Sequence, residues 1–207
     1  KGLNYDGISA YCSTIYPKLL GSYEHELHET ILNIIKKKYD RIIDIGSAEG
    51  YYAVGIPFAT KDIKQEIIAV EISDIAKQNL KKLIENNIKN KVEIVDNFSF
   101  EKYEDDKKTL VIMDCEGAEL EYLSKIKKKY LLKWDFLIEV HVQLKKNIIK
   151  KIENIFEGKK ISRIRSVDDY HKIEEYSEFV PPDFDDNTRL LLLSENRRTG
   201  MYWLSIT

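Results

Sequence analysis

The sequence predicts an α/β fold, with a doubly wound, mostly parallel sheet of seven strands that ends in an antiparallel hairpin. Three observations support this prediction. Short runs rich in isoleucine and valine recur along the chain, segments with helical periodicity lie between them, and two apolar runs flank a polar connection near the C-terminus. Strands that alternate with helices are joined by right-handed crossovers, which bring the strands side by side in one sheet.

Five apolar runs are expected to form the parallel strands, because they are short and apolar on both sides. They cover residues 41–45, 66–71, 91–95, 109–113 and 135–140. Residues 187–207 read NTRLLLLSENRRTGMYWLSIT and are expected to form the hairpin, since Gly200 lies in the polar stretch between two apolar runs.

Two segments between the strands have the spacing of amphipathic helices, residues 23–38 and residues 73–87. Ser73 has the position and the side chain of an N-cap. Residues 117–126 and 145–156 supply two further helices. The apolar faces are expected to consist of Leu27, Ile31, Ile34 and Ile35 in the first segment and of Ile75, Leu80, Leu83 and Ile84 in the second.

The length of 207 residues is sufficient for one domain with a sizeable core, so we expect residues 1–207 to form a single domain. Residues 1–40 are expected to be its N-terminal helical segment. Residues 157–188 become acidic and aromatic toward their end, and we expect them to form a loop or lid before the hairpin.

The composition disfavours several kinds of partner. The 33 basic residues nearly balance the 35 acidic ones, which gives no general attraction to nucleic acid or to anionic lipid. The two cysteines form neither a disulfide framework nor a zinc site, and no run approaches the roughly 18 apolar residues of a membrane span. We therefore expect a cytoplasmic protein without nucleic-acid or membrane partners. Its oligomeric state is not indicated.

The turn after the first predicted strand is a candidate binding site. Residues 44–50 read DIGSAEG, and glycine there permits the backbone to pass close to a ligand at the carboxyl edge of the sheet. The spacing is G-x-x-x-G and differs from the dinucleotide pattern G-x-G-x-x-G. Because the carboxylates of Asp44 and Glu49 repel a pyrophosphate and attract a cation, a cationic ligand is the better electrostatic match.

Acidic residues end four successive predicted strands at the same edge of the sheet, and these are Asp44, Glu71, Asp96 and Asp114. A carboxylate at Glu71 can accept hydrogen bonds from both ribose hydroxyls of an adenosine, and Asp96 lies within reach of an adenine amino group. Each acid alone could instead cap a helix or form a turn, but the four together indicate a ligand site.

The stretch DIGSAEG, followed by Glu71, resembles the first and second motifs of class I S-adenosylmethionine-dependent methyltransferases, which have a Rossmann-like sheet. The stretch IMDCEGAELEYL, residues 112–123, resembles the D-x-E-G-A-E stretch of the FkbM group, whose known members methylate hydroxyl groups. The resemblance covers residues 21–145 and the terminal hairpin. It departs from the group in GSAEG, where an asparagine is frequent before the last variable residue.

The resemblance implies S-adenosylmethionine as cofactor and a small-molecule acceptor, such as a sugar or a polyketide-like metabolite. Asp114 is expected close to the transferred methyl group. The residues expected around the methionine part of the cofactor are Asp44, Gly46, Ser47 and Gly50.

The resemblance also implies the residues around the nucleoside. Tyr23 and Glu24 resemble a segment that closes over the cofactor, although Ser22 could equally cap a helix start there. The residues expected beside the ribose and the adenine are Glu71, Ile72, Asp96 and Asn97.

Methyl transfer from a sulfonium is an in-line displacement, and a neutral hydroxyl acceptor benefits from a base or a metal that lowers its pKa. In LIEVHV, residues 137–142, the period of two places Glu139 and His141 on one side of the strand, and His141 is the side chain best suited to take a proton near neutral pH. With Asp114 these two could instead hold magnesium or manganese, or form structural hydrogen bonds. Glu116 is a further candidate at this edge.

Other functions remain open on sequence alone. A nicotinamide-dependent oxidoreductase could share the sheet, but the glycine spacing and the acidic turn disfavour it. An aminopropyl transferase would share Glu71 and should have a denser acidic acceptor pocket. A non-catalytic Rossmann-like binding module could keep the fold without turnover. Nucleic-acid methylation is disfavoured because, apart from Arg163 and Arg165, no basic patch is interleaved with aromatic residues.

Overall fold

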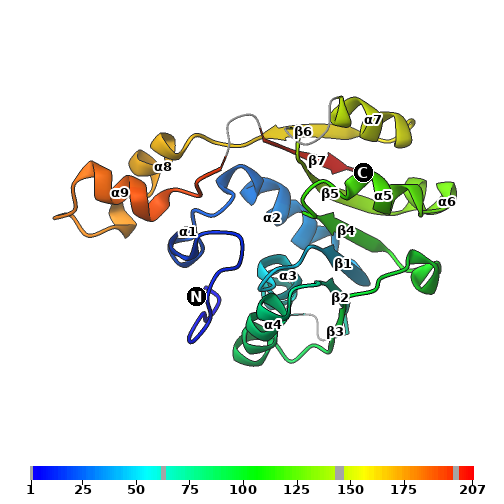
Figure 1. The fold of residues 1–207 in the computed structure, drawn as a ribbon, viewed down its shortest axis with the longest axis horizontal. Helices are drawn as coiled ribbons and strands as arrows, with labels where there is room; N and C mark the ends of the chain where they lie inside the picture. Colours follow the sequence, from blue (N-terminus) through cyan, green and yellow to red (C-terminus); the bar gives the residue numbers. More distant parts are fainter. Residues whose placement is uncertain (1, 62–63, 143–146, 198–200) are drawn as a thin grey trace.

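The computed structural model describes residues 2–61, 64–142, 147–197 and 201–207. The strands in this part of the chain are β1 (Arg41–Ile45), β2 (Glu66–Val70), β3 (Val92–Val95), β4 (Thr109–Met113), β5 (Asp135–Val140), β6 (Ile161–Arg165) and β7 (Tyr202–Ile206). They form one sheet in the order β3-β2-β1-β4-β5-β7-β6 (Figure 1). Strands β1 to β5 pair in parallel, and β7 is antiparallel to β5 and β6. The predicted fold class is confirmed.

Helices cover both faces of this sheet (Figure 1). One face packs against α2 (His28–Lys37), α3 (Tyr51–Thr60) and α4 (Asp74–Asn87), and the other against α5 (Glu119–Ser124), α6 (Lys128–Lys133) and α7 (Ile148–Ile155). Three more helices, α1 (Ile15–Leu20), α8 (Asp169–Glu175) and α9 (Asp186–Leu193), gather beyond one end of the sheet. Among the described residues, no helix is both long enough and apolar enough to span a membrane.

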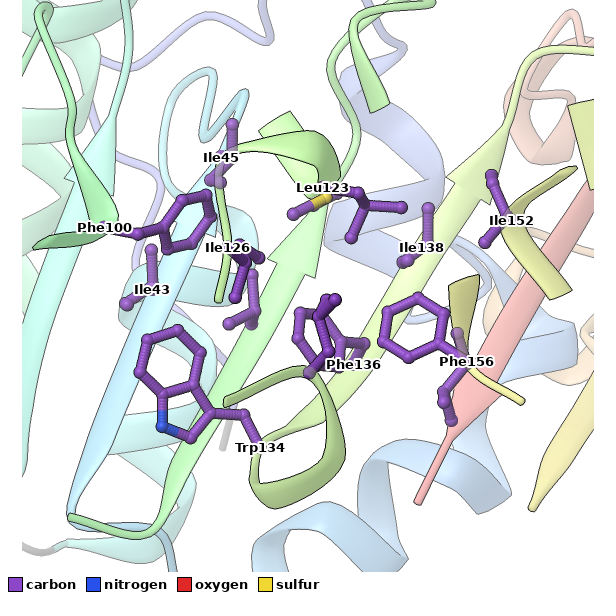
Figure 2. Packing of buried hydrophobic residues seen from close by; sticks show 14 of the residues in the cluster. Ile43, Ile45, Phe100, Leu123, Ile126, Trp134, Phe136, Ile138, Ile152 and Phe156 are labelled. Carbon is purple, nitrogen blue, oxygen red and sulfur yellow. The ribbon is translucent and has the colours of Figure 1, made fainter. Parts of the chain in front are cut away.

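The largest apolar cluster lies between the sheet and the layer of α5, α6 and α7. Figure 2 shows Ile43 and Ile138 from the sheet beside the aromatic rings of Trp134 and Phe156, and all four side chains are buried. Ile42, one residue earlier in β1, points to the opposite face and packs in the cluster of α2 and α3. The central strands are mostly apolar because helices cover both of their faces.

The predicted helices form with small differences. Ser73 caps α4 as expected, and its hydroxyl accepts a hydrogen bond from the backbone N–H of Ala76 at 3.4 Å. Leu80 and Leu83 are fully buried on that helix, whereas Ile75 is 64% exposed, so its assignment to the buried face was wrong. The segment predicted as one helix over residues 23–38 begins with a 3₁₀ turn, η1 (His25–Leu27), before α2. Two further 3₁₀ turns are η2 (Phe100–Tyr103) and η3 (Ser177–Phe179).

The sequence identified only one of the two hairpin strands correctly. Strand β7 forms where expected, but its partner is β6, and the leucine run 190–193 belongs to helix α9. Asp185 caps this helix by accepting a hydrogen bond from the N–H of Thr188 at 2.7 Å, and Leu193 is buried in a small separate cluster with Tyr176 and Val180. Residues 157–188, expected to be a loop or lid, contain β6 and α8.

Strand β6 is an edge strand of the sheet. Its side chains Ser162, Arg163 and Arg165 are exposed, and the Arg163 guanidinium donates two hydrogen bonds to Glu153 at 2.6 and 2.7 Å. The sequence ISRIR lacks the continuous apolar character of the central strands, which explains why it was not predicted as a strand.

Candidate functional site

Two adjoining cavities lie at the carboxyl ends of the parallel strands. The first cavity, about 330 Å³, lies beside the turn after β1 and the end of β2. The second cavity, about 370 Å³, lies beside the ends of β4 and β5. Both volumes are in the range of small-molecule sites. The cavities meet at five shared residues, which are Cys12, Ser13, Tyr23, Asp114 and Glu116.

The turn between β1 and α3 requires glycine at two positions. Gly46 has φ 81° and Gly50 has φ 96°, both in the left-handed region. A Cβ atom on Gly46 would stand 1.7 Å from the backbone oxygen of Asp114, and one on Gly50 would stand 2.3 Å from Cδ1 of Leu80. The turn can therefore pack between the end of β4 and the middle of α4 only without side chains at these two positions. Gly46 and Ser47 line the first cavity, whereas Gly50 does not.

Asp44 is buried at the base of this turn, with 3% of its surface exposed. Its Oδ2 accepts a hydrogen bond at 3.0 Å from the N–H of Ala53 in the first turn of α3. Burial raises the pKa of Asp44, the Ala53 bond lowers it, the charges of Asp114 and Glu71 raise it, and the net pKa is about 7. A positive charge in the first cavity would favour the ionised form of this carboxyl group.

Glu71 follows β2 and lines the first cavity. One carboxylate oxygen accepts a hydrogen bond from the N–H of Ala48 at 2.8 Å, and the other from the N–H of Ser73 at 2.7 Å. These amides hold the carboxylate in place, and each oxygen keeps a second lone pair for a ligand hydroxyl. Ile72 lines the same cavity and is 78% exposed. An exposed apolar side chain at this place can cover the ring of a ligand.

Besides Gly50, three predicted cofactor residues do not line the first cavity, and these are Glu24, Asp96 and Asn97. Asp96 is exposed, with a carboxylate oxygen 3.6 Å from Nζ of Lys77, and neither it nor Asn97 lines the first cavity. Glu24 is buried and forms an ion pair with the guanidinium of Arg197. Tyr23 does line both cavities.

Residues from the segment 11–18 also line the first cavity, and the sequence did not predict them as site residues. Lys18 forms a buried ion pair with Glu49, whose other oxygen accepts a hydrogen bond from the N–H of Tyr11 at 3.1 Å. Lys18 therefore balances the charge of Glu49, which the sequence had suggested as part of the attraction for a cationic ligand. Asp44 and Glu71 still face the cavity. No local signal links Lys18 with Glu49, because 31 residues separate them.

Four carboxylates surround His141 beside the second cavity. Nδ1 of His141 lies 2.7 Å from Oε1 of Glu119. Nε2 faces the other three carboxylates, at 3.3 Å from Glu116, 3.5 Å from Glu139 and 3.6 Å from Asp114. Burial lowers the pKa of His141, but the hydrogen bond with Glu119 and the charge of Asp114 raise it, and the net direction is upward.

The structure thus brings together the three residues predicted for acceptor chemistry. One ligand atom each from Asp114, Glu139 and His141 lies within 4.8 Å of the others. Glu139 is 3% exposed, and burial together with the charge of Asp114 raises its pKa well above the ordinary value. Glu119 was quoted in the D-x-E-G-A-E stretch but not assigned to the site, although its place at the start of α5 directs it to His141.

Arg197 was missed as a site residue, because it was assigned to a polar hairpin connection. It lines the second cavity beside Glu139 and Glu195. Its NH1 lies 3.0 Å from Glu26 and 3.4 Å from Glu139, and its Nε lies 3.0 Å from Glu195. Glu195 also forms an ion pair with Lys172 of α8. These ion pairs therefore connect α8, through Glu195 and Arg197, with Glu139 of β5.

No protein-family model matches the sequence, and a search of curated proteins finds no match. Solved structures do match. The precorrin-6y C5,15-methyltransferase of Geobacter metallireducens GS-15 has a TM-score of 0.54 at 14% identity and covers 100% of this chain and 96% of its own. A candidate rRNA methylase of Clostridium thermocellum has a TM-score of 0.55 at 14% identity, with coverages of 87% and 94%.

Methyltransferase FkbM from Methylobacillus flagellatus KT is 18% identical, with a TM-score of 0.49 over 61% of this chain and 40% of its own. This likeness is too low to assign the chain to the FkbM group. At identities of 14%, the two better matches establish the fold. The chain therefore has the fold of the class I S-adenosylmethionine-dependent methyltransferases.

Proposed function

We propose that the protein is an S-adenosylmethionine-dependent methyltransferase that methylates a hydroxyl oxygen of a small molecule. The observation that carries this proposal is the meeting of the two cavities at Asp114. One cavity has the glycine turn and Glu71, and the other has His141 with its carboxylates. When bound, the cofactor supplies a methyl group on a positively charged sulfur.

The residues of the first cavity fit this cofactor. The Glu71 carboxylate is oriented by two backbone amides and can accept hydrogen bonds from ribose hydroxyls. Asp44 and Asp114 place negative charge beside the same cavity, which suits a sulfonium better than a pyrophosphate. Tyr11 and Tyr23 also line this cavity.

On the acceptor side, the protein must align the hydroxyl and receive its proton. In the transfer, the new oxygen–carbon bond forms while the carbon–sulfur bond breaks and its electron pair goes to sulfur. The hydroxyl proton goes to a basic group at the second cavity, where His141, Asp114 and Glu139 lie together. The FkbM-like stretch around Asp114 also favours a hydroxyl acceptor. The second cavity has the volume of a small-molecule site.

A dinucleotide cofactor fits the sheet less well. In the described residues β7 is antiparallel and lies between β5 and β6, which departs from the strand order 3-2-1-4-5-6 of dinucleotide-binding sheets.

A second candidate is an aminopropyl transferase. The carboxylates of Asp114, Glu116, Glu139 and Glu195 line the second cavity, as expected of a site for a polyamine. Arg197 lines the same cavity and opposes a cationic acceptor, so we prefer the hydroxyl.

Calorimetric titration with S-adenosylmethionine, S-adenosylhomocysteine and NAD tests the proposed cofactor. We expect saturable one-site binding of the first two and none of NAD. Binding of NAD alone would contradict the proposal. Binding of the sulfonium cofactor without methyl transfer to any hydroxyl compound would favour a binding module.

Replacing His141 tests the acceptor side. His141→Ala is expected to lower turnover far more than cofactor affinity, because the ring faces the second cavity. The control is His171→Ala, an exposed histidine of α8. Methylation should be followed with single-turnover kinetics alongside calorimetry, and turnover of His141→Ala equal to that of the control would exclude a catalytic role for His141.

A further inference from the structure

We propose that Asp114, Glu139 and His141 form a site for a divalent cation of the magnesium or manganese type at the floor of the second cavity. The proposal rests on the proposed function only for the role of the cation in methyl transfer. Binding of the cation itself is independent of that function.

The geometry around Nε2 of His141 is unfavourable without a positive charge. Glu119 holds Nδ1 at 2.7 Å, and because a carboxylate only accepts hydrogen bonds, Nδ1 carries the proton. As long as the ring is neutral, the lone pair of Nε2 points toward Asp114, Glu116 and Glu139, whose oxygens are also electron-rich. Four such atoms in one place need a cation or extra protons between them.

The distances match a shared cation better than hydrogen bonds. The three oxygens lie 3.3 to 3.6 Å from Nε2, longer than the usual 2.9 to 3.0 Å of a hydrogen bond from nitrogen. Two ligands of one cation, each about 2.1 to 2.3 Å from it, are separated by roughly 3.0 to 4.6 Å. The ligand atoms of Asp114, Glu139 and His141 lie within 4.8 Å of one another.

Glu139 gives independent support for a ligand at this place. Only 3% of its side-chain surface is exposed, and the residue lines the second cavity. Its Oε2 lies 3.5 Å from Nε2 of His141, whereas its Oε1 has no hydrogen bond and lies 3.4 Å from NH1 of Arg197. Among the described residues, Oδ1 of Asp114, the atom 3.6 Å from Nε2, also has no hydrogen-bond partner. Buried carboxylate oxygens in this state are costly, so an unassigned partner is expected.

The surrounding charges do not supply that partner. Arg197 is shared among Glu24, Glu26, Glu139 and Glu195, and Lys172 reaches only Glu195 of these four. The two cationic side chains thus face four carboxylates. Asp114 and Glu116 are two further carboxylates near the same place. A divalent cation at Nε2 would offset the excess of negative charge.

His141 also has a hydrogen bond that is typical of metal-binding histidines, between its second ring nitrogen and a carboxylate. A carboxylate on the second ring nitrogen orients the imidazole and makes it a stronger ligand, and Glu119 has this position. Two of the three ligands are carboxylates, which suit manganese and magnesium. Three protein ligands would leave open positions for an acceptor oxygen, whose proton would then go to Glu116, the carboxylate near Nε2 that is not a ligand.

Titration with Mn²⁺ in the absence of S-adenosylmethionine, followed by electron paramagnetic resonance, tests the site. We expect one saturable site in the wild-type protein and at least tenfold weaker binding in Glu139→Gln and His141→Gln. The control is Glu93→Gln, since Glu93 lies on the edge strand β3 and pairs with Lys102. Glu119→Gln should weaken Mn²⁺ binding roughly 10- to 100-fold by releasing the ring of His141.

The variants must be folded for the comparison to hold, so circular dichroism melting accompanies each titration. Mn²⁺ binding that is equal in the wild type, Glu139→Gln and His141→Gln would overturn the proposal, because the ion would then lie elsewhere. Absence of millimolar Mn²⁺ binding would also overturn it and would mean that protons neutralise the cluster. Calorimetry with S-adenosylmethionine, run on the same samples, decides the proposed function separately.

Discussion

Glu71 is the side chain whose loss should affect cofactor affinity most directly. Glu71→Ala is expected to weaken binding of S-adenosylmethionine by about 1.5 to 3 kcal/mol, the scale of a charge-assisted hydrogen bond. S-adenosylhomocysteine should lose a similar amount, because it carries the same ribose. The measurement is calorimetry, with Glu85→Ala on the exposed face of α4 as control. Unchanged affinity would remove Glu71 from the ribose site.

Asp44 should couple stability to pH. Because its folded pKa of about 7 lies above the ordinary value of 3.8, the folded protein holds this proton more tightly than the unfolded chain. Ionisation of Asp44 therefore costs stability as the pH rises from about 4 through 7, and the loss is complete above pH 7. Asp44→Asn keeps an acceptor for the N–H of Ala53 and should raise the melting temperature at pH 8 but not at pH 4.

The same substitution should alter ligand preference. The sulfur of S-adenosylmethionine is positively charged and that of S-adenosylhomocysteine is neutral, so Asp44→Asn should weaken binding of the first more than of the second. Calorimetry at pH 8 gives both affinities. An unchanged affinity ratio would show that the charge of Asp44 does not act on the sulfonium.

Several site residues could be predicted from sequence because of where strands end. Asp44, Glu71 and Asp114 lie at the carboxyl ends of recognisable apolar strands, so their convergence follows from the parallel sheet. Lys18 and Arg197 could not be predicted in this way. Each meets its carboxylate partner only through tertiary packing, across 31 residues for Lys18 and 173 for Arg197 with Glu24.

At the scale of elements, the docking of residues 11–18 and helix α1 depends on the buried pair of Lys18 and Glu49. Lys18→Met would leave the Glu49 carboxylate buried without its cation, and we expect a loss of about 3 kcal/mol in the free energy of unfolding. Lys18→Met combined with Glu49→Gln should recover most of this loss. Urea denaturation of the single and double variants measures both effects, and equal stability of the two variants would contradict this account.

Element prediction succeeded where periodicity was long or burial was complete. The central strands and α4 have such patterns, and all of them form where expected, within one residue at their ends. It failed for α9 and β6. The leucine run of α9 is too short to separate a helix from a strand, and β6 alternates imperfectly because it is an exposed edge strand.

For the whole molecule, cofactor binding should stabilise the fold as a unit. A ligand at 100 times its dissociation constant adds about 2.7 kcal/mol to the free energy of unfolding. For a chain of this size that corresponds to a rise in melting temperature of about 5–10 °C. Differential scanning calorimetry with S-adenosylmethionine should show this rise, and NAD at the same concentration should produce none.

The position of β6 at the edge of the sheet has a consequence for self-association. An edge strand exposes backbone groups that can pair with the edge of another molecule, and like charges oppose such pairing. When two β6 strands approach each other, the exposed side chains of Arg165 from both copies are brought together and repel, whereas the charge of Arg163 is paired with Glu153. Arg165 therefore opposes β-aggregation through this edge of the sheet.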